Sequence, residues 1–237
     1  MIAMLFYNIT YSIAAEDLLL KFEVVSIPTS VTFKSSHETD SAYSAAHNIN
    51  GDILMGNCDG FTLLKRETMQ ASSYIEDATS IESIAEYDGI VYALESGIEK
   101  STVKVYGSES KELLFDFPCV SGSNIGTVTA SKQYVAATVT NCGSLYLYDT
   151  CNKQTSTLLL SGVIHFAPDG SLVVIEDDSE TLSKYKIEDG ELIKLWTCKD
   201  NFEYATAVCT DCHGLIYVFT APHYNSPSID VLCPQGM

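Results

Sequence analysis

Acidic side chains gather in the segments that follow short apolar runs of this sequence. They are Asp59, Glu95, Glu99, Glu176, Asp177, Asp178 and Glu180, and only Lys100 offsets them. Hard cations such as Ca²⁺ take several carboxylate and carbonyl oxygens as ligands, so this set is a candidate calcium site. A solvated acidic surface that opposes aggregation explains the same residues without a ligand, and we favour that interpretation.

Cysteine provides the only other metal-like spacing, which is Cys209-x-x-Cys212 followed by His213. A structural zinc site needs a second pair of ligands of this kind, and the sequence has none. Cys209 also lies in an apolar run, where a thiol behaves as a small buried hydrophobic side chain. We therefore expect structural thiols and no bound metal.

Motifs of common catalytic sites are missing from the sequence. It contains no Gly-x-Ser-x-Gly elbow, no P-loop, no Gly-x-Gly-x-x-Gly and no His-Glu-x-x-His. The sequence thus predicts no catalytic residue and no cofactor, and it favours a protein that is not an enzyme.

The charge balance argues against nucleic acid as a partner. The 237 residues include 13 Lys and Arg against 31 Asp and Glu, which gives a formal net charge of −18. Phosphate backbones are met by clustered basic side chains, and Lys65-Arg66 is the only adjacent basic pair here. An acidic surface instead favours solubility and basic partners.

A repeat indicates which elements must position these side chains. Short runs rich in Val, Ile, Tyr and Thr are separated by Gly, Asn, Asp and Ser, which is typical of strands and turns. The turns are Asn50-Gly51, Asp88-Gly89, Lys132-Gln133, Asp169-Gly170 and His213-Gly214, and they recur every 37 to 44 residues. Asn-Gly and Asp-Gly supply the positive φ angles of two-residue hairpins, so each turn is expected to join two antiparallel strands.

The strands align when the turns are aligned. The residues that open the second strand of each repeat are Ile53, Val91, Val135, Leu172 and Ile216. Third strands follow in all five repeats, and fourth strands in three, at 113–115, 157–160 and 192–196. Four strands about every forty residues are typical of a propeller blade. Sandwiches and jelly rolls also use short strands, but they do not require five turns in phase.

The sequence therefore predicts an all-β protein, a β-propeller of five, or six, four-stranded antiparallel blades over residues 18–237. The repeats are expected at about 41–80, 81–123, 124–161, 162–203 and 204–237. In this alignment His165 shares a column with Ala46, Ile84, Val128 and Cys209, so we expect a buried core histidine. His213 is expected to be a solvated turn residue.

The fifth repeat ends where its fourth strand should begin, and residues 18–25 (LLLKFEVV) have the pattern of a fourth strand. We expect this segment to complete the last blade and close the ring, since closure removes exposed sheet edges. The alternative is that residues 1–25 are the end of an earlier blade and that the chain is a fragment of a larger propeller.

Residues 1–17 form an apolar segment ahead of the repeats. No Lys or Arg precedes the apolar stretch, and Asn8, Thr10, Tyr11 and Ser12 interrupt it, so it makes a poor signal peptide. It is also too short and too polar to span a membrane. We expect a cytoplasmic, monomeric protein with no membrane partner.

The fifth repeat resembles a repeat of the NHL type. Gly214-Leu215-Ile216-Tyr217-Val218 matches the turn glycine and the following strand of that pattern, and residues 228–236 (SIDVLCPQG) match its later part. Copies at 88–106 and 169–187 match more loosely, and the usual Asn-His-Arg ahead of the third strand is missing in every copy. Propellers of this kind occur at the C-terminus of tripartite-motif ubiquitin ligases, so the resemblance implies the substrate-recognition part of a ligase-like protein.

Three functions remain open at this point. The first is a non-catalytic interaction module that binds a protein or peptide on one face. The second is a calcium-dependent hydrolase or lactonase, similar to the gluconolactonase family, that uses the acidic loops. The third is an extracellular or carbohydrate-binding propeller, which the apolar N-terminus and the Asn8-Ile9-Thr10 sequon suggest. Because propellers support all three, the fold alone does not decide between them.

Overall fold

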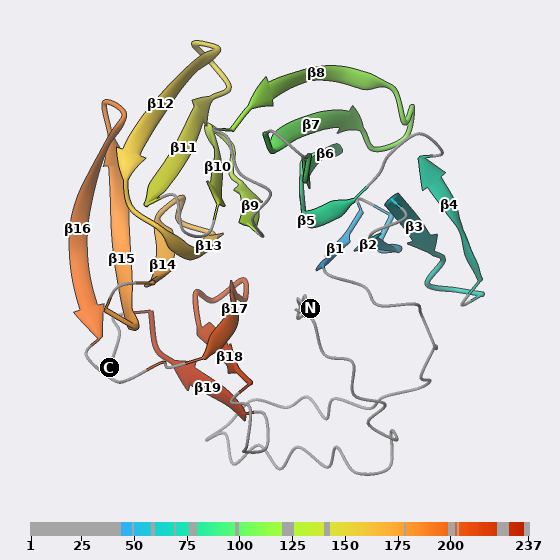
Figure 1. The fold of residues 1–237 in the computed structure, drawn as a ribbon. Coiled ribbons are helices and arrows are strands. Elements are labelled where there is room, and N and C mark those ends of the chain that lie inside the picture. The colour runs from blue at the N-terminus through green and yellow to red at the C-terminus, as the bar shows by residue number, and fades with distance from the viewer. Residues whose placement is uncertain are drawn as a thin grey trace.

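The computed structural model describes residues 44–48, 50–57, 60–68, 70–75, 80–97, 100–119, 126–139, 143–177, 179–198, 202, 204–221 and 228–234. Within these residues the strands form five antiparallel sheets around a common axis (Figure 1). The protein is a five-bladed β-propeller, as the repeat predicts. We number the blades 1 to 5 in chain order. The apolar segment 1–17 and the expected strand 18–25 lie outside the described residues.

Each blade is built from strands that are consecutive in the chain. Blade 1 contains β1 (Ser44–His47), β2 (Ile53–Asn57), β3 (Gly60–Leu64) and β4 (Ala71–Ile75). Blade 2 contains β5 (Ile81–Tyr87), β6 (Ile90–Glu95), β7 (Thr102–Gly107) and β8 (Leu113–Pro118). Blade 3 contains β9 (Gly126–Ala130), β10 (Tyr134–Val139), β11 (Ser144–Asp149) and β12 (Gln154–Leu159). Blade 4 contains β13 (Gly162–Phe166), β14 (Leu172–Glu176), β15 (Thr181–Glu188) and β16 (Glu191–Cys198). Blade 5 contains β17 (Ala205–Thr210), β18 (Ile216–Thr220) and β19 (Ser228–Leu232).

The strand order fixes which loops share a face of the propeller. The first strand of every blade lies nearest the axis, and the innermost strands of successive blades contact each other from β1 through β5, β9 and β13 to β17. Because neighbouring strands are antiparallel, the turns after first strands emerge on one face. The loops after second strands emerge on the opposite face. We call these the turn face and the loop face.

The first turns are of three kinds, which the sequence did not separate. In blade 3 the turn covers 131–134, and the Ser131 N–H donates to the Tyr134 carbonyl at 2.8 Å. In blade 2 Asp88 and Gly89 have φ angles of 51° and 77° and make a two-residue hairpin, as predicted. In blades 1, 4 and 5 the turn is a five-residue loop over 48–52, 167–171 and 211–215. The N–H of the first loop residue donates to the carbonyl of the fifth. The carbonyl of the first residue accepts a hydrogen bond from the N–H of the glycine at the fourth position. Those glycines have φ angles of 79° to 80°, which explains the residue type.

The shorter turns of blades 2 and 3 shift the register of the inner strand by one residue relative to blades 1, 4 and 5. His165 lies opposite Val173 in the β13–β14 pair, and the equivalent positions on the other inner strands are Ala46, Ala85, Thr129 and Cys209. The predicted column with Ile84 and Val128 was therefore wrong for blades 2 and 3. The column of second strands was correct, since all five residues occupy equivalent places. Of these five, Val91, Val135, Leu172 and Ile216 are buried, whereas Ile53 is half-buried.

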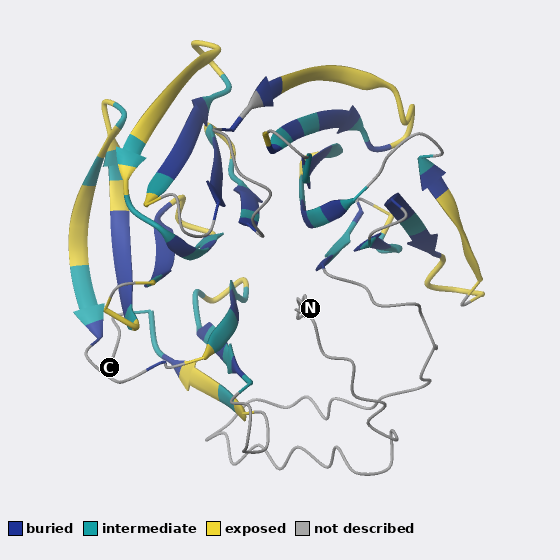
Figure 2. Cartoon of the chain, viewed as in Figure 1, coloured by how far each residue is buried: buried dark blue, intermediate teal, exposed yellow. Residues whose placement is uncertain are grey.

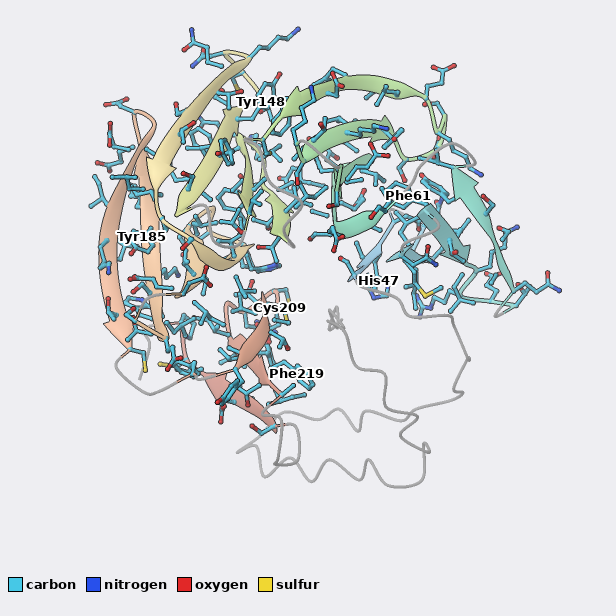
Figure 3. The ribbon with its side chains drawn as sticks, in the orientation of Figure 1. His47, Phe61, Tyr148, Tyr185, Cys209 and Phe219 are labelled. Atoms are coloured by element: carbon cyan, nitrogen blue, oxygen red, sulfur yellow. The ribbon has the colours of Figure 1, made fainter. Side chains whose placement is uncertain are left out.

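Among the described residues, four hydrophobic cores lie between successive blades. The core between blades 2 and 3, for example, joins Leu94, Val103 and Phe117 of one sheet to Val135 and Tyr146 of the next. Figure 3 shows Phe61, Tyr148 and Tyr185 among the side chains that fill these spaces. The middle strands are thus covered on both faces, which explains why they are apolar at consecutive positions.

Hydroxyl side chains on the inner strands also bind successive blades together. The Ile84 N–H donates to Ser44 Oγ at 2.9 Å, and the Val128 N–H donates to Ser83 Oγ at 3.0 Å. Between blades 3 and 4, the Phe166 N–H donates to Thr129 Oγ1 at 2.9 Å. A small hydroxyl residue on an inner strand therefore satisfies a buried backbone donor of the next blade.

Outermost strands are exposed, as Figure 2 shows for β8, β12 and β16. Leu113, Leu195 and Leu159 keep 53%, 51% and 96% of their surface exposed. The fourth strand of blade 1, β4, was not predicted, because its sequence ASSYI lacks an apolar run. No helix in the part of the chain that the structure describes has the length and apolar character needed to cross a bilayer.

Candidate functional site

Four of the seven predicted acidic residues are described, and all four lie on the loop face. Glu95 ends β6 in blade 2, while Glu176 ends β14 in blade 4. Asp177 and Glu180 lie in the loop between β14 and β15. Blade 3 lies between Glu95 and the other three residues, so Glu95 does not share a site with them. Asp59, Glu99 and Asp178 lie outside the described residues.

Two of these carboxylates are held by lysines of their own blade. Lys104 Nζ lies 2.5 Å from Glu95 Oε2. Lys194 Nζ lies 2.8 Å from Glu176 Oε1, and the Tyr185 hydroxyl donates to the same oxygen at 2.6 Å. Both acids end the second strand of a blade, so their role recurs in the repeat. This pairing gives each carboxylate a structural function within the sheet.

The pKa of Glu176 reflects this arrangement. Partial burial acts to raise it, but the hydrogen bonds from Lys194, Ser183 and Tyr185 outweigh burial and lower the pKa to about 2. Glu176 is therefore a carboxylate at every physiological pH, and its charge is matched by Lys194.

A small hollow of about 150 Å³ opens on the loop face between blades 4 and 5. Glu176, Asp177 and Glu180 line it from blade 4, and Phe202 and Tyr204 line it from the connection into blade 5. Tyr204 is an exposed aromatic residue, with 47% of its surface accessible. The hollow thus combines acidic side chains with an aromatic ring, which suits a cationic or basic group.

The backbone around this hollow is fixed by hydrogen bonds and is strained at two positions. The Glu180 N–H donates to the Glu176 carbonyl at 2.9 Å, and the Phe202 N–H donates to the Glu180 carbonyl at 3.0 Å. Glu180 and Tyr204 have φ angles of 52° and 62°, in the left-handed region that side chains other than glycine rarely adopt. Such outliers persist where the surroundings enforce them, and they are common at functional sites.

The described residues contain no cluster of three His, Cys, Asp or Glu side chains that could hold a metal ion. Cys209 lies on β17, where burial, and then Asp211, raise the pKa of its thiol to about 11. Cys212 is an exposed free thiol in the following loop, and the His213 N–H donates to Asp211 Oδ1 at 2.9 Å. Cys209 is thus part of strand β17, and Cys212 is part of the turn that follows it.

His165 is the histidine that sequence reasoning placed in the core. It lies on β13 with intermediate exposure, and desolvation lowers its pKa to about 4. The imidazole is therefore neutral at physiological pH.

A second hollow was missed at the level of sequence. It opens on the turn face between blades 2 and 3, and Tyr87, Asp88, Tyr92 and Lys132 are among its lining residues. The aligned turns Asp88-Gly89 and Lys132-Gln133 place these residues side by side, so the repeat register was the signal that could have found it. Tyr92 itself is indistinguishable in sequence from a core aromatic.

Comparison with known proteins shows the fold. No family model matches the sequence, and no curated protein matches it. A solved protein from Bacteroides caccae described as of unknown function has a TM-score of 0.60 at 14% identity, covering 81% of this chain and 77% of that one. A chain of the mitotic checkpoint complex has a TM-score of 0.60 at 14% identity, with 86% and 68% covered.

The Cps50 (Swd1) β-propeller domain of Myceliophteria thermophila has a TM-score of 0.58 at 12% identity, covering 82% of this chain and 69% of that domain. Identities this low show a common fold and do not show a common family. The NHL-type resemblance stays a prediction, and the structure is similar to β-propellers of several kinds.

Proposed function

We propose that this protein is a non-catalytic interaction module that binds a protein or peptide partner on its loop face, at the hollow between blades 4 and 5. The observation that carries this proposal is the exposed Tyr204 ring beside the carboxylates of Asp177 and Glu180, on a backbone fixed by hydrogen bonds. Aromatic residues at fixed positions are enriched at binding surfaces.

The partner is expected to present a basic residue. The chain carries a formal net charge of −18, so its field attracts cationic partners over a long range. At the hollow itself, Lys194 matches Glu176, whereas Glu180 is exposed and makes no side-chain ion pair with a described residue. A Lys or Arg side chain of the partner would meet Glu180 and could stack on Tyr204.

The fold neighbours support an interaction role, because one of them is a chain of the mitotic checkpoint complex, a protein assembly. The NHL-type resemblance adds a narrower hypothesis, which is the substrate-recognition part of a ubiquitin-ligase-like protein. It rests on residues 214–218 at the start of β18 and on 228–232, which form β19. We place the module in the cytoplasm, where the free thiols of Cys151 and Cys212 would stay reduced.

A charge-reversal pair tests the loop-face site. The probe is a fluorescein-labelled peptide of alternating Arg and Ser, titrated by fluorescence anisotropy against a Glu and Ser peptide of the same length. Glu180→Lys is expected to weaken binding of the basic peptide about fivefold or more. Glu112→Lys changes the net charge equally on the turn face, where Glu112 is exposed, and should leave affinity within about twofold.

Two results would reject the site. One is the absence of saturable binding to the basic peptide at low salt. The other is an equal loss of affinity in both variants, because that would assign binding to the overall charge of the protein and not to the hollow.

A further inference from the structure

The hollow on the turn face has the size of a ligand site. Its volume is about 540 Å³, and it lies between the first turns of blades 2 and 3. Binding pockets for small ligands and short peptide segments typically measure about 300–1,000 Å³. Its position on the turn face separates it from the acidic hollow by the full height of the blades.

Tyr92 gives this hollow a hydrogen-bond donor. The residue is only 6% exposed and its ring belongs to the core between blades 2 and 3, yet it lines the hollow. No described residue makes a hydrogen bond with its hydroxyl. Burial, and then the nearby Tyr148 and Glu86, raise the pKa of Tyr92 to about 12, so the phenol keeps its proton. The hydroxyl faces the open hollow, where an acceptor on a ligand would take the place of water.

The other lining groups narrow the chemistry of that ligand. Tyr87 offers an aromatic ring that is 38% exposed, and Ile90 adds apolar surface. The hydroxyls of Ser131 and Thr150 are used within the protein, by the Tyr134 carbonyl at 3.1 Å and the Gln133 carbonyl at 2.9 Å. A sugar needs many polar partners, and few are left here.

Two opposite charges stand on opposite walls of the hollow. Asp88 comes from the blade 2 turn and Lys132 from the blade 3 turn, and both residues are exposed. The Thr150 hydroxyl donates to the backbone carbonyl of Lys132 at 3.3 Å, but neither charged side chain makes a hydrogen bond or ion pair with a described residue. The hollow therefore offers a ligand one neutral donor (Tyr92), one anion (Asp88) and one cation (Lys132) beside aromatic and aliphatic surface.

We propose that this hollow binds a proline-rich peptide segment in the polyproline II conformation. That conformation has no internal hydrogen bonds, so its carbonyl oxygens are free to accept from the Tyr92 hydroxyl. Proline has no N–H, so burying it on the Tyr87 ring leaves no donor unpaired. Aromatic-lined grooves recognise such segments because the peptide is already ordered before binding. Charged residues flanking the prolines would meet Asp88 or Lys132 and set the direction of the peptide.

The experiment uses fluorescein-labelled decaproline as the probe, with a labelled Gly-Ser peptide of equal length as its control. Wild-type protein is expected to bind decaproline saturably in fluorescence anisotropy and to bind the Gly-Ser peptide at least tenfold more weakly. Tyr92→Phe removes only the hydroxyl, and it should weaken binding about tenfold, which corresponds to about 1.4 kcal/mol. Tyr87→Ala should weaken binding to a similar extent.

Two readouts separate binding from folding. Because no described residue makes a hydrogen bond with the Tyr92 hydroxyl, Tyr92→Phe should keep the melting temperature of the wild type. Tyr87 is exposed, so Tyr87→Ala decides the matter if Tyr92→Phe proves unstable. Ile193→Ala removes a comparably exposed apolar side chain from β16, which lines neither hollow, and it should leave decaproline binding unchanged.

The proposal fails if decaproline binds no better than the Gly-Ser peptide, or if Tyr92→Phe and Tyr87→Ala bind it like the wild type. It also fails if Ile193→Ala weakens decaproline binding as much as Tyr87→Ala does. The basic peptide that tests the loop face uses a different variant, Glu180→Lys, so each of the two proposals can fail without the other.

Discussion

Lys194 lies 2.8 Å from the carboxylate of Glu176 and so ties the outermost strand of blade 4 to the end of its second strand. The Tyr185 hydroxyl, on the strand between them, donates to the same carboxylate oxygen. The Lys194 ammonium also lies 5.2 Å from the centre of the Tyr185 ring. Side chains thus join three strands at the loop face, around a residue that the sequence placed in a candidate calcium set but assigned by preference to a solvated acidic surface.

This arrangement predicts a pH dependence of stability. The pKa of Glu176 falls from an ordinary value of 4.5 to about 2, so its stabilising contribution is complete above the ordinary value and is lost as the pH falls toward 2. Between about pH 5 and pH 2, the wild type should lose about 1–2 kcal/mol more unfolding free energy than Glu176→Gln. Urea unfolding at a series of pH values measures this difference. Parallel curves for the two proteins would contradict the role of Glu176.

The column of second-strand residues predicts a stability cost in the cores. Leu172 is fully buried between blades 3 and 4, so Leu172→Ala should cost about 2–4 kcal/mol through lost burial and a residual cavity. Leu159→Ala makes the same chemical change at a side chain that is 96% exposed, and it should cost less than about 0.5 kcal/mol. Denaturant unfolding compares the two variants. Equal effects would mean that the column does not lie in the core.

The hydroxyls between blades make a second stability prediction. Ser83→Ala removes the acceptor for the Val128 N–H, which is then buried without a partner. The expected loss is about 1–3 kcal/mol of unfolding free energy. Ser156→Ala is the matched control, because Ser156 is exposed on β12. Amide hydrogen exchange at Val128 gives a local readout, and unchanged protection there would contradict the bond.

Local turn chemistry made most of the fold predictable, and its ambiguity explains the register error. Glycine at Gly51, Gly170 and Gly214 predicts a tight turn but does not distinguish a two-residue hairpin from a five-residue loop, since both place a positive φ at that residue. The difference moved the inner-strand column by one residue in blades 2 and 3. Strand β4 was missed because its pairing with β3 depends on the sheet and not on its own polar sequence.

The candidate sites were predictable only in part. Antiparallel topology places every loop after a second strand on one face, so the position of Glu95 and Glu176 followed from the repeat. Their lysine partners did not, because Lys194 reaches Glu176 across an intervening strand. Tyr204 joins the hollow from the connection between blades, and Tyr92 combines a core ring with an open hydroxyl; both depend on packing between repeats.

Calcium gives a prediction for the acidic loops. Because Lys194 and Lys104 already match Glu176 and Glu95, we expect no saturable heat on titration with Ca²⁺ and no change of melting temperature with a chelator. Isothermal titration and thermal unfolding measure these quantities. A rise of several degrees with Ca²⁺, reversed by the chelator, would revive the hydrolase hypothesis.

The last prediction concerns the fourth strand of blade 5. Among the described residues, blade 5 has three strands where the other blades have four, and β19 is its outermost strand. Residues 18–25 alternate, with Leu18, Leu20, Phe22 and Val24 on one side, as a half-buried strand requires. We expect this segment to pair with β19.

Deleting residues 1–25 should then cause aggregation or cooperative loss of structure, because it leaves an open strand edge. Cysteines placed one at a time along 18–25 should form a disulfide with Val231→Cys at one or two positions only. A soluble truncated protein of unchanged stability, or cross-linking without position dependence, would instead favour a remnant of an earlier blade.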